Sequence, residues 1–247
     1  MLQETRLIMG MPICVAISGA ATAADLEAAF DGFLQADVRF SPFRADSELS
    51  RLNRRELAPQ DCSPQMREIL ELAEQTRIDS DGYFDIRRPD GTLDPCGIVK
   101  GWAIRAAALA LAGRGLSDFL IDAGGDIQAC GRNAKGEDWR VGIRNPFRAG
   151  EIVKVLFPRG AGVATSGTYL RGAHIYNPHA PDAAPDDIVS LTVIGPDILE
   201  ADRFATAAFA MGETGIEFIE RAQGLEGYQI NAQGMAHMTS GLGRYLS

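Results

Sequence analysis

The segment FLIDAGGDIQACG, residues 119–131, has two short apolar runs separated by the glycines Gly124 and Gly125. A glycine pair between β-type runs is typical of a tight turn, and a tight turn joins antiparallel strands. We therefore predict a strand, a turn and a second strand here. β-Branched or alternating residues predict further strands at ICVAI (13–17), WRVGI (139–143), EIVKVLF (151–157) and IVSLTVI (188–194), and a terminal hairpin at GYQIN (227–231) and MAHM (235–238).

Apolar residues at helical spacing predict helices between these strands. Thr22 is the expected N-cap of the first helix and Ser63 that of the second. Two more helices are predicted at IVKGWAIRAAALALAG (98–113) and LEADRFATAAFAMG (199–212). Because the helices and strands do not alternate as strict β-α-β units, the predicted fold class is α+β. We expect mixed or antiparallel sheets flanked by helices, in a single compact unit over residues 1–247.

The composition is that of a globular protein: 46% of the 247 residues are hydrophobic and 23% are charged. The formal net charge of −9 argues against a nucleic-acid-binding surface, for which a basic face is expected. An acidic protein can still bind an anionic ligand, because a local Mg²⁺ ion or backbone N–H groups can hold a phosphate.

The four cysteines are widely spaced and form no C-x-x-C pair, which argues against a disulfide framework or a zinc site. The first twenty residues, MLQETRLIMGMPICVAISGA, lack the basic and then apolar pattern of a signal peptide. No apolar run is long enough to suggest a membrane-spanning segment. A cytoplasmic location is therefore expected, unless a leader precedes this sequence.

Asp202 and Thr206 lie one helical turn apart on an otherwise apolar helix. Asp197 and Glu200 resemble a capping box, so Asp202 is not needed as the helix cap. A carboxylate on an apolar helix requires a partner. Carboxylate and hydroxyl oxygens suit Mg²⁺, with water or phosphate completing its coordination. A structural hydrogen bond is the alternative that the residues leave open.

Three other segments carry residues suited to an anionic ligand. LDPCGIVKGWA (93–103) puts Lys100 near a helix start, where N–H groups favour anions, or is simply a turn before a helix. IDAGGDI (121–127) offers backbone N–H groups, or is only a tight turn. VATSGTYLRGAHIYNPH (163–179) contains hydroxyls, glycine and two of the three histidines, but not the G-x-S-x-G elbow of a hydrolase.

These segments occur in an order that resembles the ApbE-type FAD:protein FMN transferases, in a short variant. The resemblance covers nearly the whole chain. It runs through RLIMGMP, SPFRADSELSRLN, DGYFDI, LDPCGIVKGWA, LIDAGGDI, VGIRNP, ATSGTYLRGAHIYNPH and LTVIGPDILEADRFATAAFAMG. It implies Mg²⁺-dependent transfer of FMN from FAD to a Thr or Ser hydroxyl of an acceptor protein, with release of AMP.

The resemblance also implies roles for individual residues. His174 would activate the acceptor hydroxyl, acting with Asp202 and Lys100 as the catalytic residues. Mg²⁺ would be held by Asp202, Thr206, Gly97 and the position of Ala205. The flavin nucleotide would contact Met9, Phe43, Tyr83, Phe84, Asp85, Asp94, Lys100 and Tyr176.

The chain departs from the family pattern at two places. Ala205 stands where many members carry a second carboxylate, which removes one charge from the metal site. The stretch of residues 85–94 is short where the family has tens of residues more, which affects the expected docking of the acceptor. Two alternatives follow from the same residues: hydrolysis of FAD to FMN and AMP, and binding of FAD without catalysis.

Overall fold

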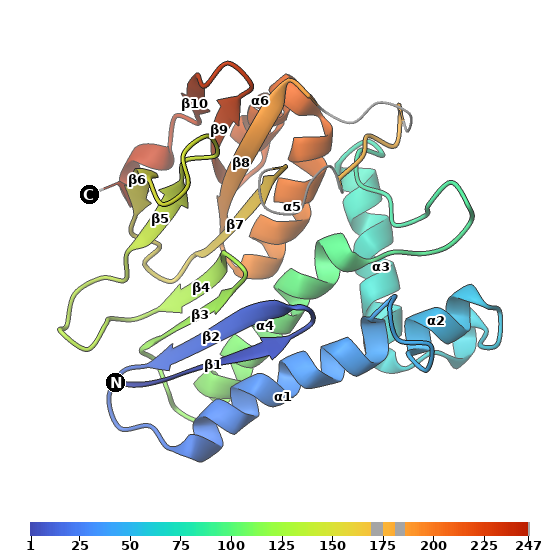
Figure 1. Cartoon of the computed structure of the whole chain (residues 1–247), viewed down its shortest axis with the longest axis horizontal. Coiled ribbons are helices and arrows are strands. Elements are labelled where there is room, and N and C mark those ends of the chain that lie inside the picture. Colours follow the sequence, from blue (N-terminus) through green and yellow to red (C-terminus); the bar gives the residue numbers. More distant parts are fainter. Residues whose placement is uncertain (169–174, 181–185, 247) are drawn as a thin grey trace.

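An eight-stranded antiparallel sheet forms the centre of the protein in the computed structural model, which describes all residues except 169–174, 181–185 and 247 (Figure 1). Its strand order is β1-β2-β3-β4-β7-β8-β9-β10, and β5 and β6 pair as a separate hairpin. The strands are β1 (Leu2–Ile8), β2 (Met11–Ile17), β3 (Phe119–Ala123), β4 (Asp126–Cys130), β5 (Val141–Arg144), β6 (Ile152–Leu156), β7 (Gly162–Gly167), β8 (Ile188–Gly195), β9 (Glu226–Asn231) and β10 (Ala236–Met238).

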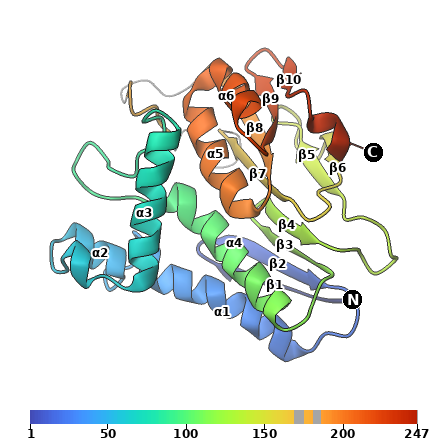
Figure 2. The ribbon, with the colours of Figure 1, turned by 180° about the vertical axis from the view of Figure 1, so that it is seen from behind.

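Helices cover one face of this sheet. Figure 2 shows α4 and α5 side by side across that face, with α1 running along the end that holds β1 and β2. The helices are α1 (Ala23–Phe40), α2 (Glu48–Asn53), α3 (Pro64–Asp79), α4 (Cys96–Gly113), α5 (Ile198–Ala210) and α6 (Gly215–Arg221). This arrangement confirms the predicted α+β class with antiparallel sheets flanked by helices.

Strands β4, β7, β8 and β9 of the sheet are buried on both faces, so the protein has two hydrophobic cores. Adjacent residues of a strand point to opposite faces. Accordingly, Val193 of β8 packs in the core under the helices, whereas its neighbour Ile194 packs in the core under the β5–β6 hairpin. Burial on both faces explains why Ser190 and Thr192, which alternate with apolar residues in IVSLTVI, are buried like their neighbours.

The predicted helix caps are formed by local hydrogen bonds. The Ser63 hydroxyl accepts a hydrogen bond from the Met66 N–H at 3.2 Å, and Asp25 completes a capping box with Thr22. Asp197 caps α5 by accepting from the Glu200 N–H at 3.0 Å. The predicted capping box at α5 is only half present, because the Glu200 carboxylate pairs with Arg203 instead.

Three of the strands and helices were not predicted from the sequence, and one of them is β7, whose residues were considered only as a possible ligand-binding segment. Residues 2–8 form β1, the edge strand that pairs with β2, although their polar residues gave no strand signal. Residues 48–53 form the short helix α2, capped by Ser47, within a segment that reads as polar and turn-rich. For β1 and α2, pairing or packing against a neighbouring element stabilises a segment whose own sequence preference is weak.

Helix α4 is long and apolar enough, by length and composition alone, to cross a membrane. In this fold it lies between α1 and α5 and contacts β3 and β4. Its apolar residues Ile98, Ile104, Ala107 and Leu111 are fully buried there. Core packing therefore accounts for its composition.

Gly162 provides a test of how β7 supports α5. A Cβ atom at Gly162 would lie 2.2 Å from the backbone N of Ile198, at the start of α5. Since backbone cannot move aside as a side chain does, we expect Gly162→Ala to lower the free energy of unfolding by about 1–3 kcal/mol or more. Denaturant unfolding measures this change. Gly113→Ala is the control, because no atom lies within 4 Å of its Cβ position, and it should be neutral or slightly stabilising.

Candidate functional site

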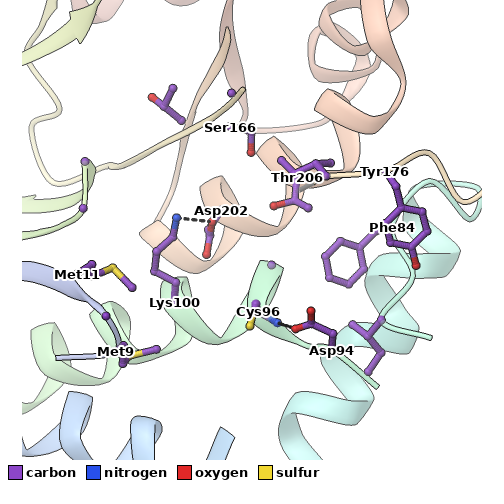
Figure 3. A pocket seen from close by; sticks show the side chains of 18 of the residues that line it. Met9, Met11, Phe84, Asp94, Cys96, Lys100, Ser166, Tyr176, Asp202 and Thr206 are labelled. Carbon is purple, nitrogen blue, oxygen red and sulfur yellow. Dashed lines mark hydrogen bonds and ion pairs between the residues drawn. The ribbon is translucent and has the colours of Figure 1, made fainter. Parts of the chain in front are cut away.

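A cavity of about 860 Å³ opens where the start of α4, the middle of α5, the β1–β2 turn and the end of β7 meet (Figure 3). Its volume lies within the range typical of cofactor sites. Eleven of the residues predicted for the site line it: Met9, Phe43, Tyr83, Phe84, Asp85, Asp94, Gly97, Lys100, Tyr176, Asp202 and Thr206. Residues far apart in the sequence are thus brought to one place.

Two glycines allow α4 and α5 to cross closely at the floor of this cavity. Gly97 and Gly101 are one turn apart on α4 and face Thr206 and Asp202, one turn apart on α5. A Cβ at Gly101 would lie 2.8 Å from the Asp202 Cβ, and one at Gly97 would lie 3.1 Å from the Thr206 Cγ2. The two helices could not approach this closely with larger residues at these positions.

Asp202 is 3% exposed and has two partners from α4. Its Oδ2 accepts a hydrogen bond from the Gly101 N–H at 2.7 Å. In a regular helix that N–H would donate to the Gly97 carbonyl, so the bond to Asp202 competes with the helical one. Its Oδ1 lies 3.6 Å from the Lys100 Nζ. Asp202 therefore makes the structural hydrogen bond that the sequence left open, and one oxygen remains directed toward the ammonium group.

The charge of Asp202 is held at an energetic cost. Burial, and to a smaller extent the carboxylate of Asp126, raises the pKa of Asp202 to about 7, against the opposing effects of Lys100 and the Gly101 N–H. Lys100 also forms a close ion pair with Asp126 of β4. A strongly perturbed carboxyl group beside a cavity is typical of functional sites.

The oxygens at this crossing fit a hard divalent cation. The Asp202 carboxylate, the Thr206 hydroxyl and the Gly97 backbone are neighbours at the cavity floor. In the described part of the chain, no three or more His, Cys, Asp or Glu side chains gather to hold a metal. A cation here would therefore need phosphate or water oxygens as well. Ala205, the fourth predicted metal position, is fully buried in the core and does not line the cavity.

The other end of the cavity has apolar and aromatic walls. Phe84 is buried against Gly97, and Met9 and Met11 come from the β1–β2 turn and strand β2 (Figure 3). Met9 has a left-handed backbone (φ 55°), which the tight turn before Gly10 requires. Phe43 is 94% exposed at the cavity, so its ring has one face to offer a flat ligand.

The loop between α3 and α4 is fixed by hydrogen bonds to Tyr176 and to the start of α4, and by an ion pair within the loop. The Tyr176 hydroxyl donates to the backbone carbonyls of Asp85 and Arg87, at 3.3 and 3.1 Å. Asp94 accepts from the Cys96 N–H at 3.1 Å and pairs with Arg88. The shortened loop is therefore ordered on the side that faces the cavity.

The segment 163–179 contains two histidines, His174 and His179. The Nε2 of His179 lies 2.9 Å from the backbone carbonyl of Asp81, and its ring packs edge-on against Tyr83 at 4.6 Å. These contacts give His179 a structural role. His174, the predicted base, lies outside the described residues.

Several residues of the site were not singled out from the sequence. Gly101 could have been found from its spacing of four from Gly97, which matches the spacing of Asp202 and Thr206. Asp126 belongs to the quoted segment IDAGGDI, but nothing local indicates that it pairs with Lys100. Polar residues that line the cavity but were not predicted for the site include Arg88, Asp122, Arg144, Thr165 and Ser166.

Comparisons with known proteins find one family and several relatives that this chain resembles. The sequence profile of the ApbE family matches residues 9–88 and 86–229. An FAD:protein FMN transferase of Salmonella typhimurium is 29% identical over 173 residues, which are 66% of this chain and 49% of that protein. One of Escherichia coli K12 is 30% identical over 166 residues, 64% of this chain and 47% of that protein. The chain thus spans about half the length of these curated relatives.

Solved structures share the fold. The flavin transferase ApbE of Vibrio cholerae superposes with a TM-score of 0.86 at 22% identity, covering 99% of both chains. The apo form of the Pseudomonas stutzeri flavinyl transferase ApbE gives a TM-score of 0.85 at 22% identity, covering 99% of this chain and 96% of that one.

The buried carboxyl of Asp202 predicts an unusual pH dependence. The ordinary pKa of an aspartate is about 3.9. Between pH 4 and 7, the native protein therefore holds a proton that the unfolded chain has lost, and stability falls as pH rises. An asparagine at position 202 does not titrate, so Asp202→Asn lacks this fall in stability. Relative to wild type, we expect the free energy of unfolding of Asp202→Asn to increase by up to about 1.4 kcal/mol per pH unit between pH 4 and 7. Urea unfolding from pH 4.5 to 8 measures it.

Asp25→Asn serves as the control of opposite sign. Arg114 and the Thr22 cap lower the pKa of Asp25 to about 2, so its carboxylate stabilises the fold above pH 4. Asp25→Asn should therefore be less stable than wild type at pH 8. A loss of stability in Asp202→Asn that grows from pH 4.5 to pH 8 would contradict our account of the site.

Proposed function

This chain belongs to the ApbE family, and we propose that it transfers FMN from FAD to a Thr or Ser hydroxyl of an acceptor protein, with Mg²⁺, releasing AMP. One observation carries the proposal. A single cavity joins the aromatic and apolar walls around Phe84 to the carboxylate, hydroxyl and ammonium groups at the α4–α5 crossing. A flat ring linked to a pyrophosphate has the same division into an apolar part and a charged part.

The apolar part of the cavity suits the flavin ring. Phe43 and Met9 lie on loops at its edge, where they can contact a planar ligand, and Phe84 forms its buried wall. Aromatic side chains bind flat rings with little loss of conformational entropy, because they have few rotatable bonds. The loop residues Tyr83 and Asp85 face the same space.

The charged part suits the pyrophosphate. Asp202, Thr206 and the Gly97 carbonyl would hold Mg²⁺, which when bound would neutralise negative charge on the phosphate oxygens. Lys100 lies at the same end of the cavity and brings a positive charge to that group. Because α4 and α5 are rigid core helices, these groups need little rearrangement when a ligand binds.

The proposed reaction exchanges the phosphoanhydride bond of FAD for a phosphate ester bond to the acceptor. The acceptor hydroxyl oxygen forms a bond to the phosphorus of the FMN half, and the bond from that phosphorus to the bridging oxygen breaks. The bridging oxygen leaves with AMP. His174 would accept the hydroxyl proton, since an imidazole titrates near neutral pH. The residues of the chain thus position the pyrophosphate and move one proton.

Incubation with FAD, Mg²⁺ and candidate acceptor domains tests the proposal. We expect FMN covalently attached to a Thr or Ser of the acceptor, detected by mass spectrometry, with one AMP released per flavin. Asp202→Ala should abolish both products. AMP release at a rate that no acceptor increases would instead show a pyrophosphatase. Bound FAD without AMP after hours in Mg²⁺ would show a binding protein.

Phe43 gives a prediction on ligand binding alone. Its side chain is almost fully exposed, so Phe43→Ala should leave the melting temperature of the free protein unchanged. Loss of a stacked ring contact is worth about 0.5–1.5 kcal/mol, so FAD binding should weaken by up to roughly tenfold. Fluorescence titration of FAD measures the affinity. Phe147→Ala, a half-exposed phenylalanine that does not line the cavity, should bind FAD as wild type does.

His174 gives a prediction on the proton transfer. His174→Ala should lower the rate of transfer to the acceptor by about 10²–10⁴-fold, the usual contribution of a general base, while FAD affinity stays near that of wild type. Single-turnover kinetics and FAD titration separate the two effects. Equal losses of transfer and of FAD binding would remove the role of base.

A further inference from the structure

Lys100 lies between two buried carboxylates that it contacts unequally. Its Nζ forms a close ion pair with Asp126, whereas the Asp202 Oδ1 is 3.6 Å away. The tight partner of Lys100 is therefore Asp126, which belongs to β4 and does not line the cavity. Asp202, which does line it, is the looser partner.

Asp126 is held rigidly in this position. It is 2% exposed, and its Oδ1 accepts a hydrogen bond from the Thr165 N–H at 3.0 Å. Its backbone pairs with Ala123 in the β3–β4 hairpin. A carboxylate fixed by two strands gives the lysine ammonium a defined location, because the flexible lysine stem follows its anchor.

Whether the Asp202 carboxylate can bind a cation depends on the position of the Lys100 ammonium group. The Asp202 Oδ2 is already taken by the Gly101 N–H, so Oδ1 is the carboxylate oxygen left for a ligand. An ammonium group in contact with Oδ1 would compete with a cation for the same lone pairs and would repel it. One turn further along α5, Ala205 supplies no second carboxylate that could help to bind the cation.

We propose that Asp126 is a positioning residue: its close ion pair keeps Lys100 from moving nearer to the Asp202 Oδ1 than the present 3.6 Å, so that a divalent cation can still reach this oxygen. The inference rests on the proposed function, because it takes Asp202 as the cation-binding carboxylate. Groups that orient the neighbours of a metal ligand commonly change metal affinity by 10–100-fold. Asp126 acts in this way through Lys100, with which it forms the close ion pair.

Direct Mn²⁺ binding to the purified full chain, followed by electron paramagnetic resonance, tests this inference without reference to turnover. In Asp126→Asn, the amide oxygen can still accept from the Thr165 N–H, but the ion pair with Lys100 is lost. We expect Mn²⁺ to bind roughly 10- to 100-fold more weakly. In Asp126→Asn combined with Lys100→Met, the competing ammonium is gone, so the affinity should return to that of wild type or higher.

A crystal structure of Asp126→Asn gives the second readout, in which the Lys100 Nζ should lie within hydrogen-bonding distance of the Asp202 Oδ1. The control Asp25→Asn also removes one buried, paired carboxylate, but away from the cavity, and should bind Mn²⁺ as wild type does.

Three results would overturn the inference: unchanged Mn²⁺ affinity in Asp126→Asn, weakened affinity with Lys100 still in its wild-type place, or no recovery in the double variant. These leave the proposed transferase function intact. A wild-type protein that binds no Mn²⁺, with or without FAD, would remove both the inference and the cation-dependent part of the proposed function.

Discussion

The close crossing of α4 and α5 is the constraint on which the site depends. Gly97 and Gly101 remove the side chains that would keep the helices apart, and Thr206 and Asp202 occupy the space. This contact buries the Asp202 carboxylate against the backbone N–H of Gly101, the residue that follows Lys100 on α4. Without the crossing, α5 would be an ordinary apolar core helix with an unsatisfied charge.

A second buried charge, that of Arg203, also fixes the position of α5. Arg203 is 8% exposed and pairs with Glu200 and with Asp79 of α3, while its guanidinium lies 4.1 Å from the ring of Phe204. Successive residues of α5 thus direct opposite charges to different helices. Asp202 and Arg203 are both buried and both have partners of opposite charge, which fix the position of α5 relative to its neighbours.

The charged groups of the cavity lie on rigid core elements, whereas the groups suited to a planar ring lie on turns and loops. The groups suited to a cation and a pyrophosphate lie on core helices and on β4, where packing fixes them to within small distances. The groups suited to a planar ring lie on turns and loops, where Phe43 is exposed and free of core packing. Precise charge placement thus comes from the core, and adaptable contacts come from the loops.

The sequence by itself determined the features that depend on neighbouring residues: the strand–turn–strand at 119–131, the caps at Ser63 and Asp197, and the pairing of Asp202 with Thr206 on one face. Capping bonds and side-chain periodicity act over a few residues, so a short segment contains them. Only the tertiary structure decided that Asp202 meets Gly101, that Asp126 holds Lys100, and that Ala205 faces the core. A buried charge takes its partners from whichever segments the fold brings beside it, and these can lie more than a hundred residues away: Gly101 is 101 residues from Asp202, and Asp79 is 124 residues from Arg203.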